Sequence, residues 1–117
     1  MKSIQKYKGC IVEESLTDNQ IINKLNVKKI TITRAENPSE RWHIYNVIVD
    51  EEDINKISEN IKPGWYMHFW KGNDIIVIFK DKQFKIKLND KSTWKKAVDY
   101  GISIKIPKEQ LDFKTEF

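Results

Sequence analysis

Short apolar and polar runs alternate along the whole chain, and their spacing predicts six strands and three helices. The expected strands are rich in β-branched and aromatic residues and are separated by turns that contain Gly, Pro, Asn or Asp. They cover residues 6–14, 27–34, 42–49, 65–70, 75–80 and 83–88. Apolar residues at helical spacing predict helices over residues 17–26, from Asp50 to Pro63, and after Asp90.

The start of the second expected helix carries a run of acidic residues. Asp50 is well placed to cap this helix, with Asp53 at the third helical position. The run Asp50-Glu51-Glu52-Asp53 also resembles a cation site, but the helix dipole favours carboxylates in the first turn. Because the run lacks the glycine of a calcium-binding loop, we interpret it as a cap.

The order of the first elements is that of a ferredoxin-like fold. Strand, helix, strand, strand, helix and strand follow one another over residues 6–70. Right-handed crossovers in this topology give an antiparallel sheet with both helices on one face. We therefore predict an α+β fold and one domain over residues 1–117, in which residues 71–117 add a β-hairpin and a covering helix.

Tight turns join the last three expected strands. Gly72-Asn73 is a favoured two-residue hairpin turn, which places Trp70 opposite Ile75, and residues 81–82 are expected to form the next turn. Because paired residues share a face, one face of these strands gathers nine mostly apolar side chains, too large a patch to leave in water. The nine are Tyr66, His68, Trp70, Ile75, Val77, Phe79, Phe84, Ile86 and Leu88. The side chains of the third helix expected to cover them are Trp94, Val98 and Ile102.

The composition is typical of a folded, soluble chain. Of its 117 residues, 39% are hydrophobic and 32% charged, so it has more apolar residues than a disordered chain. No apolar run approaches the roughly 18 residues of a membrane span, and residues 1–15 lack the apolar segment of a signal peptide. The single cysteine, Cys10, cannot form an internal disulfide. We therefore expect a cytoplasmic protein with no membrane contact.

The net charge of +4 is unevenly spread, with −1 over residues 1–60 and +5 over residues 61–117. A basic cluster in the second half would suit phosphate groups, and its residues are Lys80, Lys82, Lys85 and Lys87. Lysine fills polar positions throughout this chain, so we rank nucleic-acid binding below other functions. Tyr7 and Tyr45 fall on the strands that carry stacking aromatics in RNA-recognition domains, but residues 41–47 do not match that motif.

The motifs of common enzymes and metal sites are missing from the sequence. The four glycines show no G-x-G spacing, which excludes a phosphate-binding loop. Cys10, His43 and His68 fall on strands expected to be neighbours, but no fourth metal ligand stands at a typical spacing. Packing and hydrogen bonds explain a thiol and two histidines on strands better. We predict no metal, no cofactor and no catalytic residue.

Three segments of the chain are distinctive: YKGCIVEESL over residues 7–16, GWYMHFW over residues 64–70, and YGISIKIPKEQLDF over residues 100–113. With them the chain resembles, over nearly its whole length, a family of short bacterial and archaeal proteins to which no activity is assigned. The resemblance therefore implies no catalytic residues. Members of that family often have an acidic residue at the position of His68 and glycine at that of Lys105.

These observations favour a non-enzymatic binding or regulatory module that acts on a protein partner or a small-molecule ligand. Residues 27–34 alternate polar and apolar positions, which is typical of an edge strand. This edge and the uncovered part of the sheet would be the binding surfaces, and a second copy of the chain would make a homodimer. The candidate binding residues are Lys29, Thr31, Thr33, His43 and Tyr45. Weak RNA or DNA binding and an enzyme of unknown class are the alternatives.

Overall fold

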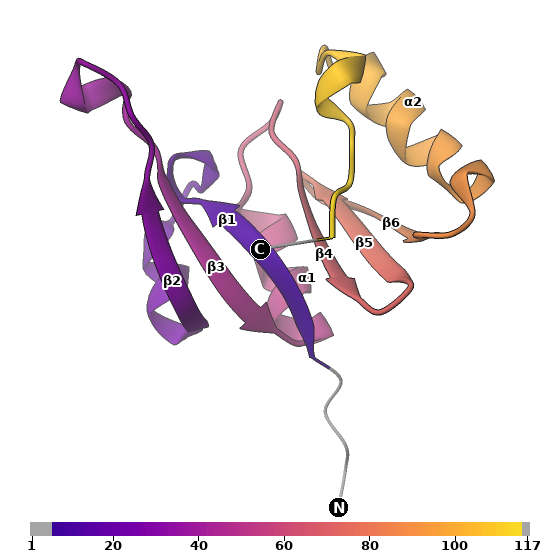
Figure 1. The fold of residues 1–117 in the computed structure, drawn as a ribbon, viewed down its shortest axis with the longest axis horizontal. Helices are drawn as coiled ribbons and strands as arrows, with labels where there is room; N and C mark the ends of the chain where they lie inside the picture. Colours follow the sequence, from indigo (N-terminus) through magenta and orange to yellow (C-terminus); the bar gives the residue numbers. More distant parts are fainter. Residues whose placement is uncertain (1–5, 116–117) are drawn as a thin grey trace, which may run out of the picture.

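The computed structural model describes residues 6–115, which form one six-stranded sheet with helices on both faces (Figure 1). The two ends of the predicted domain, residues 1–5 and 116–117, lie outside the described residues. The strands are β1 (Tyr7–Val12), β2 (Asn26–Ile32), β3 (His43–Val49), β4 (Met67–Lys71), β5 (Asp74–Phe79) and β6 (Lys82–Lys87). Their order is β2-β3-β1-β4-β5-β6, and all neighbours are antiparallel. The α+β class is confirmed.

Two α-helices and five short 3-10 helices accompany the sheet within residues 6–115. The α-helices are α1 (Glu51–Asn60) and α2 (Lys95–Ser103). The 3-10 helices are η1 (Glu13–Ser15), η2 (Asn19–Lys24), η3 (Pro38–Glu40), η4 (Lys91–Trp94) and η5 (Lys108–Gln110). The α-helix expected over residues 17–26 was wrong in type, because its place is taken by η2, a six-residue 3-10 segment. Within residues 6–115, no helix has the length and apolar character needed to cross a bilayer.

The acidic run at the start of α1 is a cap, as expected. The Asp53 backbone N–H donates to Asp50 Oδ1 at 2.8 Å, and the Asp50 N–H donates to Asp53 Oδ2 at 3.2 Å. This bond from the Asp53 backbone holds the pKa of the Asp50 carboxyl below its ordinary value. With its start fixed in this way, α1 buries Ile54 and Ile57 completely against the sheet.

The sheet separates two hydrophobic cores, one on each face. The first lies under α1, where η2 also packs, and its fully buried members include Ile11, Val47 and Phe69. The second lies on the opposite face of β4, β5 and β6, under α2 and the C-terminal segment. Only half of this second face is covered. Among the residues that the structure describes, no helix lies over the part formed by β2, β3 and β1 (Figure 1).

The first hairpin has the expected register and the second does not. Trp70 lies opposite Ile75 across Gly72-Asn73, as predicted. The second turn falls at residues 80–81 instead of 81–82, because Asp81 takes the left-handed conformation with φ 56° that the turn requires. The register therefore shifts by two positions, which is even and leaves every side chain on its expected face. Leu88 alone leaves the patch, since it lies beyond β6 and is exposed.

The cover over the second core includes two of the three residues expected, Trp94 and Val98, but not the third. Trp94 is buried there, but Ile102 of α2 is 45% exposed, so its predicted place in the cover was wrong. The space is filled by the segment after η5, where Leu111 and Phe113 are buried. Gly101 permits this packing, since a Cβ there would lie 2.8 Å from Leu111 Cδ2. We call residues 110–115 the tail.

Candidate ligand-binding groove

A groove of about 400 Å³ runs along the border between the covered and uncovered halves of the second sheet face. It combines residues of β1, β4, the segment before β4, and the tail. Its lining consists of Cys10, Val12, Trp42, Gly64, Trp65, Tyr66, Met67, His68, Trp70, Ile106, Gln110, Asp112 and Lys114. Its size is that of small-molecule sites in other proteins. We call this feature the aromatic groove.

One wall of the aromatic groove is the tail, which hydrogen bonds tie to β4. The Tyr66 hydroxyl donates to the carbonyl of Gln110, and His68 Nε2 contacts the carbonyl of Lys114. Between these two bonds the Phe113 ring is completely buried, with its centroid 5.6 Å from that of His68 and 5.8 Å from that of Tyr66. The wall is therefore anchored at three successive points.

The opposite mouth of the groove is formed by two tryptophans. Trp42 stands where the long β2–β3 connection returns to the sheet, and Trp65 stands before β4. Their rings meet edge to face, with centroids 5.3 Å apart, an attractive arrangement for an aromatic pair. Trp42 is 44% exposed, which leaves much of its surface open to a ligand.

The floor of the groove carries the polar side chains Cys10 and His68. A backbone carbonyl can only accept a hydrogen bond, so the contact with Lys114 places the His68 proton on Nε2. Burial lowers the pKa of His68, which favours this neutral form. The Cys10 thiol donates to Asn46 Oδ1 at 3.5 Å, and burial raises its pKa. A protonated thiol is a weak nucleophile, so the two groups line the groove without an activated pair.

Charge contributes little to the groove. Asp112 and Lys114 are its charged lining residues, and their formal charges cancel. Stacking and apolar contact are therefore the interactions that the site offers, with the polar edges of Cys10, Gln110 and His68 to orient a ligand.

The structure divides the candidate binding residues between the two faces of the sheet. Lys29 and Thr31 pair with Asn46 and Ile44 on the face opposite α1, and both are exposed. Thr33 continues this side and accepts a hydrogen bond from the Trp42 backbone N–H at 2.7 Å. None of the three lines the aromatic groove.

His43 and Tyr45 lie on the other face, beside η1. His43 contacts Glu14 twice, with its backbone N–H 2.8 Å from Oε1 and its Nδ1 2.7 Å from Oε2. The Tyr45 hydroxyl donates to Glu13 Oε1 at 2.6 Å. These contacts attach η1 to β3, and they place His43 on the opposite face from Cys10 and His68. The three potential metal ligands of the sequence therefore do not converge.

The carboxylates of η1 control the protonation of these two partners. The hydrogen bond to Glu13 is the main cause that raises the pKa of Tyr45 to about 12. The hydrogen bond that His43 donates to Glu14 raises the pKa of His43. Burial alone would raise the pKa of Glu14, but the side-chain and backbone hydrogen bonds from His43 lower it overall. Tyr45 and His43 are thus fully engaged in holding the fold together.

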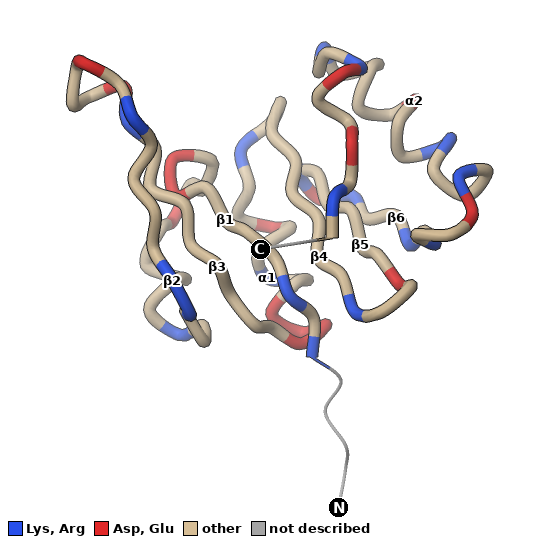
Figure 2. Tube along the Cα trace, viewed as in Figure 1, with Lys and Arg blue, Asp and Glu red and all other residues tan. Residues whose placement is uncertain are grey.

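The lysines of the nucleic-acid alternative are largely occupied by other contacts. Lys85 forms an ion pair with Glu51 at 3.1 Å, and Lys87 pairs with Asp74. Lys80 contacts the carbonyl of Glu59 and lies 3.7 Å from Asp81. Lys82 stands on the other face, 5.7 Å from the centroids of Phe84 and Tyr100. Figure 2 shows acidic residues interspersed among basic ones on this part of the fold.

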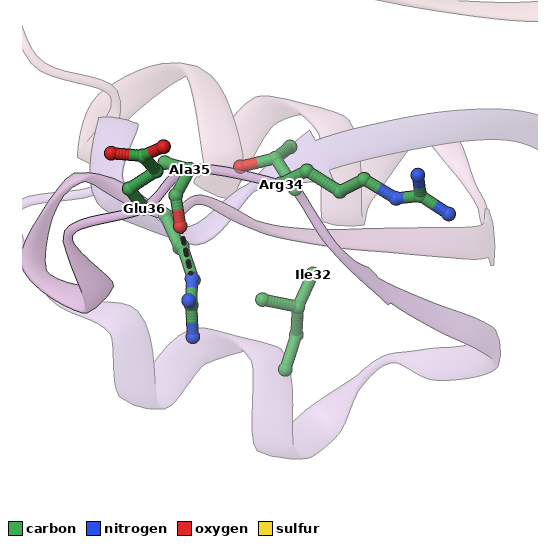
Figure 3. Close-up of a pocket in the computed structure, with 6 residues that line it drawn as sticks. Ile32, Arg34, Ala35 and Glu36 are labelled. Carbon is green, nitrogen blue, oxygen red and sulfur yellow. Dashed lines mark hydrogen bonds between the residues drawn. The ribbon is translucent and has the colours of Figure 1, made fainter.

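A second hollow lies at the edge of the sheet and is shallow and open (Figure 3). It is lined by Ile32, Thr33, Arg34, Ala35, Glu36 and Arg41. The Arg41 side chain donates through Nε to the carbonyl of Ala35 at 2.8 Å, which shapes this bend of the chain. It contains none of the stacked aromatic rings of the groove.

The residues that carry the aromatic groove were not among the candidates from the sequence. The position of Trp42 at the end of an expected strand, rather than inside it, could have singled it out as exposed. No local signal marks Asp112 or Lys114, because only the tertiary path of the tail brings them to the groove. Among residues 6–115, no three His, Cys, Asp or Glu side chains are grouped to hold a metal ion.

Comparison of the chain with protein-family models, with curated protein sequences and with solved structures finds no match. The resemblance of the three sequence segments to a family therefore stays a prediction, and the groove must be interpreted from its own chemistry.

Proposed function

We propose that this chain is a non-enzymatic binding module that takes a planar, uncharged aromatic or heteroaromatic small molecule in the aromatic groove. The observation that carries the proposal is the lining itself: five aromatic or imidazole rings border one hollow of about 400 Å³. They are Trp42, Trp65, Tyr66, His68 and Trp70. Such rings bind flat apolar molecules by stacking and by removing their surface from water.

The protonation states of the groove favour binding over chemistry. A catalytic cysteine needs a lowered pKa, whereas burial raises that of Cys10. A general base needs a group to activate, and the Cys10 thiol donates to Asn46 instead of to His68. We therefore assign both side chains to shaping and orienting the site.

We further propose that residues 6–70 are a ferredoxin-like unit to which the β5–β6 hairpin, α2 and the tail are appended. The order β2-β3-β1-β4 supports this classification, with η2 in the place of the first helix. In this interpretation the appended elements create the site, because the tail supplies the wall that the unit itself lacks.

Nucleic-acid binding is the weaker candidate. It would require Lys85 and Lys87 to exchange their partners Glu51 and Asp74 for phosphates. The face opposite α1 also lacks stacking aromatics on β1 and β3, because Tyr7 and Tyr45 point to the α1 side with the first core.

A matched series of ligands tests the proposal by calorimetry. Quinoline is planar and uncharged at neutral pH, N-methylquinolinium carries a positive charge, and quinoline-2-carboxylate a negative one. We expect quinoline to bind most tightly, because the charges of Asp112 and Lys114 cancel. Trp42→Ala should weaken quinoline binding about tenfold, the loss expected for one stacking ring.

Ile102→Ala is the matched control, because Ile102 is as exposed as Trp42 but does not line the groove. Its affinity for quinoline should equal that of the original chain. Absence of saturable binding, or equal losses in both variants, would contradict the proposal.

A further inference from the structure

The edge strand β2 exposes backbone hydrogen-bonding groups at defined residues. The Thr33 backbone N–H donates to the Trp42 carbonyl at 2.9 Å, toward the neighbouring strand. Because these groups alternate in direction along an antiparallel strand, those of Thr31 also point toward β3. The N–H and C=O groups of Ile30 and Ile32 therefore point outward, away from the sheet.

The same two residues expose apolar side chains. Ile30 and Ile32 are each 55% exposed, and both share the face of their partners in β3, Tyr45 and His43. Open backbone groups and apolar side chains thus coincide on one short segment. An added β-strand would satisfy the backbone groups and cover the side chains together.

Positive charge flanks this segment on both sides. Residues 24–41 hold five basic side chains and two acidic ones, although residues 1–60 together carry a net charge of −1. The acidic ones, Glu36 and Glu40, stand in the connection between β2 and β3, and Figure 2 shows acidic positions at the tip of this connection and basic positions along β2. The basic ones are Lys24, Lys28 and Lys29 before the segment, and Arg34 and Arg41 after it.

None of these five basic side chains forms an ion pair within residues 6–115. Arg41 donates through Nε to the carbonyl of Ala35, so its terminal N–H groups are left for another acceptor. Carboxylates on other elements of the first sixty residues do have basic partners, such as His43 for Glu14. The uncompensated charge at the β2 edge is positive, which favours a partner of negative charge.

A second copy of the chain does not supply that charge. Antiparallel pairing about Thr31 would set Lys28 opposite Arg34, and parallel pairing would set Lys28 and Lys29 beside their own counterparts. Like charges directly opposite one another destabilise a strand pair. The lysines therefore act against self-pairing, as lysines on edge strands usually do, whereas they would attract an acidic strand.

We propose that the Ile30–Ile32 segment of β2 binds an extended segment of a partner protein, in which two apolar positions alternate with a polar one between acidic residues. The apolar positions would cover Ile30 and Ile32, and the acidic ones would face the basic residues at each end. The hollow of Figure 3, which Ile32, Arg34 and Arg41 border, is open to receive a side chain of this partner. The aromatic groove lies beyond β3 on β1 and β4, so the two sites can be occupied independently.

Three short peptides with blocked ends test this proposal in anisotropy titrations. EEVTVEE places two valines opposite the isoleucines and glutamates at both ends, and its sequence is the same in either strand direction. VEETEEV has the same composition and charge without the pattern, and KKVTVKK keeps the pattern with reversed charge. We expect EEVTVEE to bind at least about tenfold more tightly than either of the other two.

Variants of the chain locate the site. Ile32→Pro removes only an outward N–H, which edge strands tolerate, and should weaken EEVTVEE binding about tenfold in a folded chain. Lys29→Glu combined with Arg34→Glu should reverse the preference, so that KKVTVKK binds more tightly than EEVTVEE. Lys96→Glu combined with Lys108→Glu makes the same change of charge on exposed residues away from β2, and should keep the original preference.

Hydrogen exchange tests the strand pairing itself, because bound EEVTVEE should protect the Ile30 and Ile32 amides. Equal binding of EEVTVEE and VEETEEV would indicate general charge attraction and would overturn the proposal. Absence of saturable binding would overturn it as well, as would a preference that persists when Lys29 and Arg34 are both replaced by glutamate. A chain that dimerises along β2 and excludes the peptide would show that the occupant is a second copy instead.

Discussion

Gly9 of β1 lies directly against the ring of Phe69 in β4, so that a Cβ on Gly9 would stand 2.2 Å from Phe69 Cδ1. The two residues are opposite one another in the sheet, and the Phe69 ring fills the space above Gly9 in the first core. This contact allows the large ring to sit at the centre of the sheet. It also makes Gly9 the position of β1 least able to accept a side chain.

Gly9→Ala should therefore destabilise the protein, by roughly 1–3 kcal/mol in urea unfolding, the usual cost of overpacking a core. In a chain that already carries Phe69→Leu, the smaller side chain leaves room for the new methyl group. In that background, Gly9→Ala should lower the free energy of unfolding by clearly less than it does in the original chain. Equal costs in the two backgrounds would show that the ring is not the cause.

Lys105 follows the end of α2, two residues beyond Ser103, and is the position there that most favours replacement by glycine. Its φ of 76° is left-handed, and the Ile106 and Lys105 N–H groups bond to the Gly101 and Ile102 carbonyls, as in a Schellman motif. Lys105→Gly should raise the free energy of unfolding by about 0.5–1 kcal/mol. Ser103→Gly, inside the helix, should lower it by a similar amount. A loss of stability in Lys105→Gly would contradict this account of the helix end.

Phe113 anchors the tail in the second core. It is completely buried and contacts the rings of Tyr66, His68 and Trp94. Phe113→Ala should lower the free energy of unfolding by about 3–5 kcal/mol, as for a phenylalanine truncated in a core. The control Ile102→Ala should change stability little. A small effect of Phe113→Ala would mean that the tail does not close the second core.

The two histidines should titrate on opposite sides of their ordinary pKa of 6.5. The hydrogen bond that His43 donates to Glu14 raises the pKa of His43, whereas burial lowers that of His68. Proton NMR of the imidazole signals measures both pKa values, and the variants His43→Gln and His68→Gln assign each signal to its histidine. Coincident titrations would contradict the contacts described for η1 and the tail.

The Glu14–His43 pair also gives stability a defined pH dependence. Its His43 part is fully present below pH 6.5 and is lost as the pH rises through the raised folded pKa. Its Glu14 part is fully present above pH 4.5 and is lost as the pH falls through the lowered folded pKa. The pair therefore stabilises most between about pH 4.5 and 6.5. A comparison of melting temperatures for the original chain and His43→Gln should show the largest difference in that window, and a difference independent of pH would contradict the pairing.

Local signals in the sequence predicted most of the sheet. Gly72-Asn73 fixes a hairpin without ambiguity, so the pairing of Trp70 with Ile75 was correct. The next turn was one position out because either neighbour of Asp81 could complete it, and the register shift of two that follows still placed the side chains on the right faces. Asp50 and Asp53 likewise identified the start of α1.

Long-range packing determines the features that the sequence did not predict: the cover of the second core, the aromatic groove, and the partners of His43 and Tyr45. Helical spacing favoured Ile102 for the second core, but the tail competes for that space and places Phe113 there. The aromatic groove depends on the same packing of the tail, because Asp112 and Lys114 reach the groove only through the path of the tail. His43 and Tyr45 were selected on a strand with both faces partly open, and only the position of η1 shows that they bind Glu14 and Glu13.

The central claim is that the aromatic groove binds a planar uncharged ligand, and the indole N–H signals of the four tryptophans test it most directly. Trp42, Trp65 and Trp70 line the groove, whereas Trp94 donates its indole N–H to the Lys87 carbonyl at 2.7 Å, away from it. In a ¹H–¹⁵N titration with quinoline, we predict saturable shifts of the first three signals and a stationary Trp94 signal. Four stationary signals, or four that move equally, would contradict the claim.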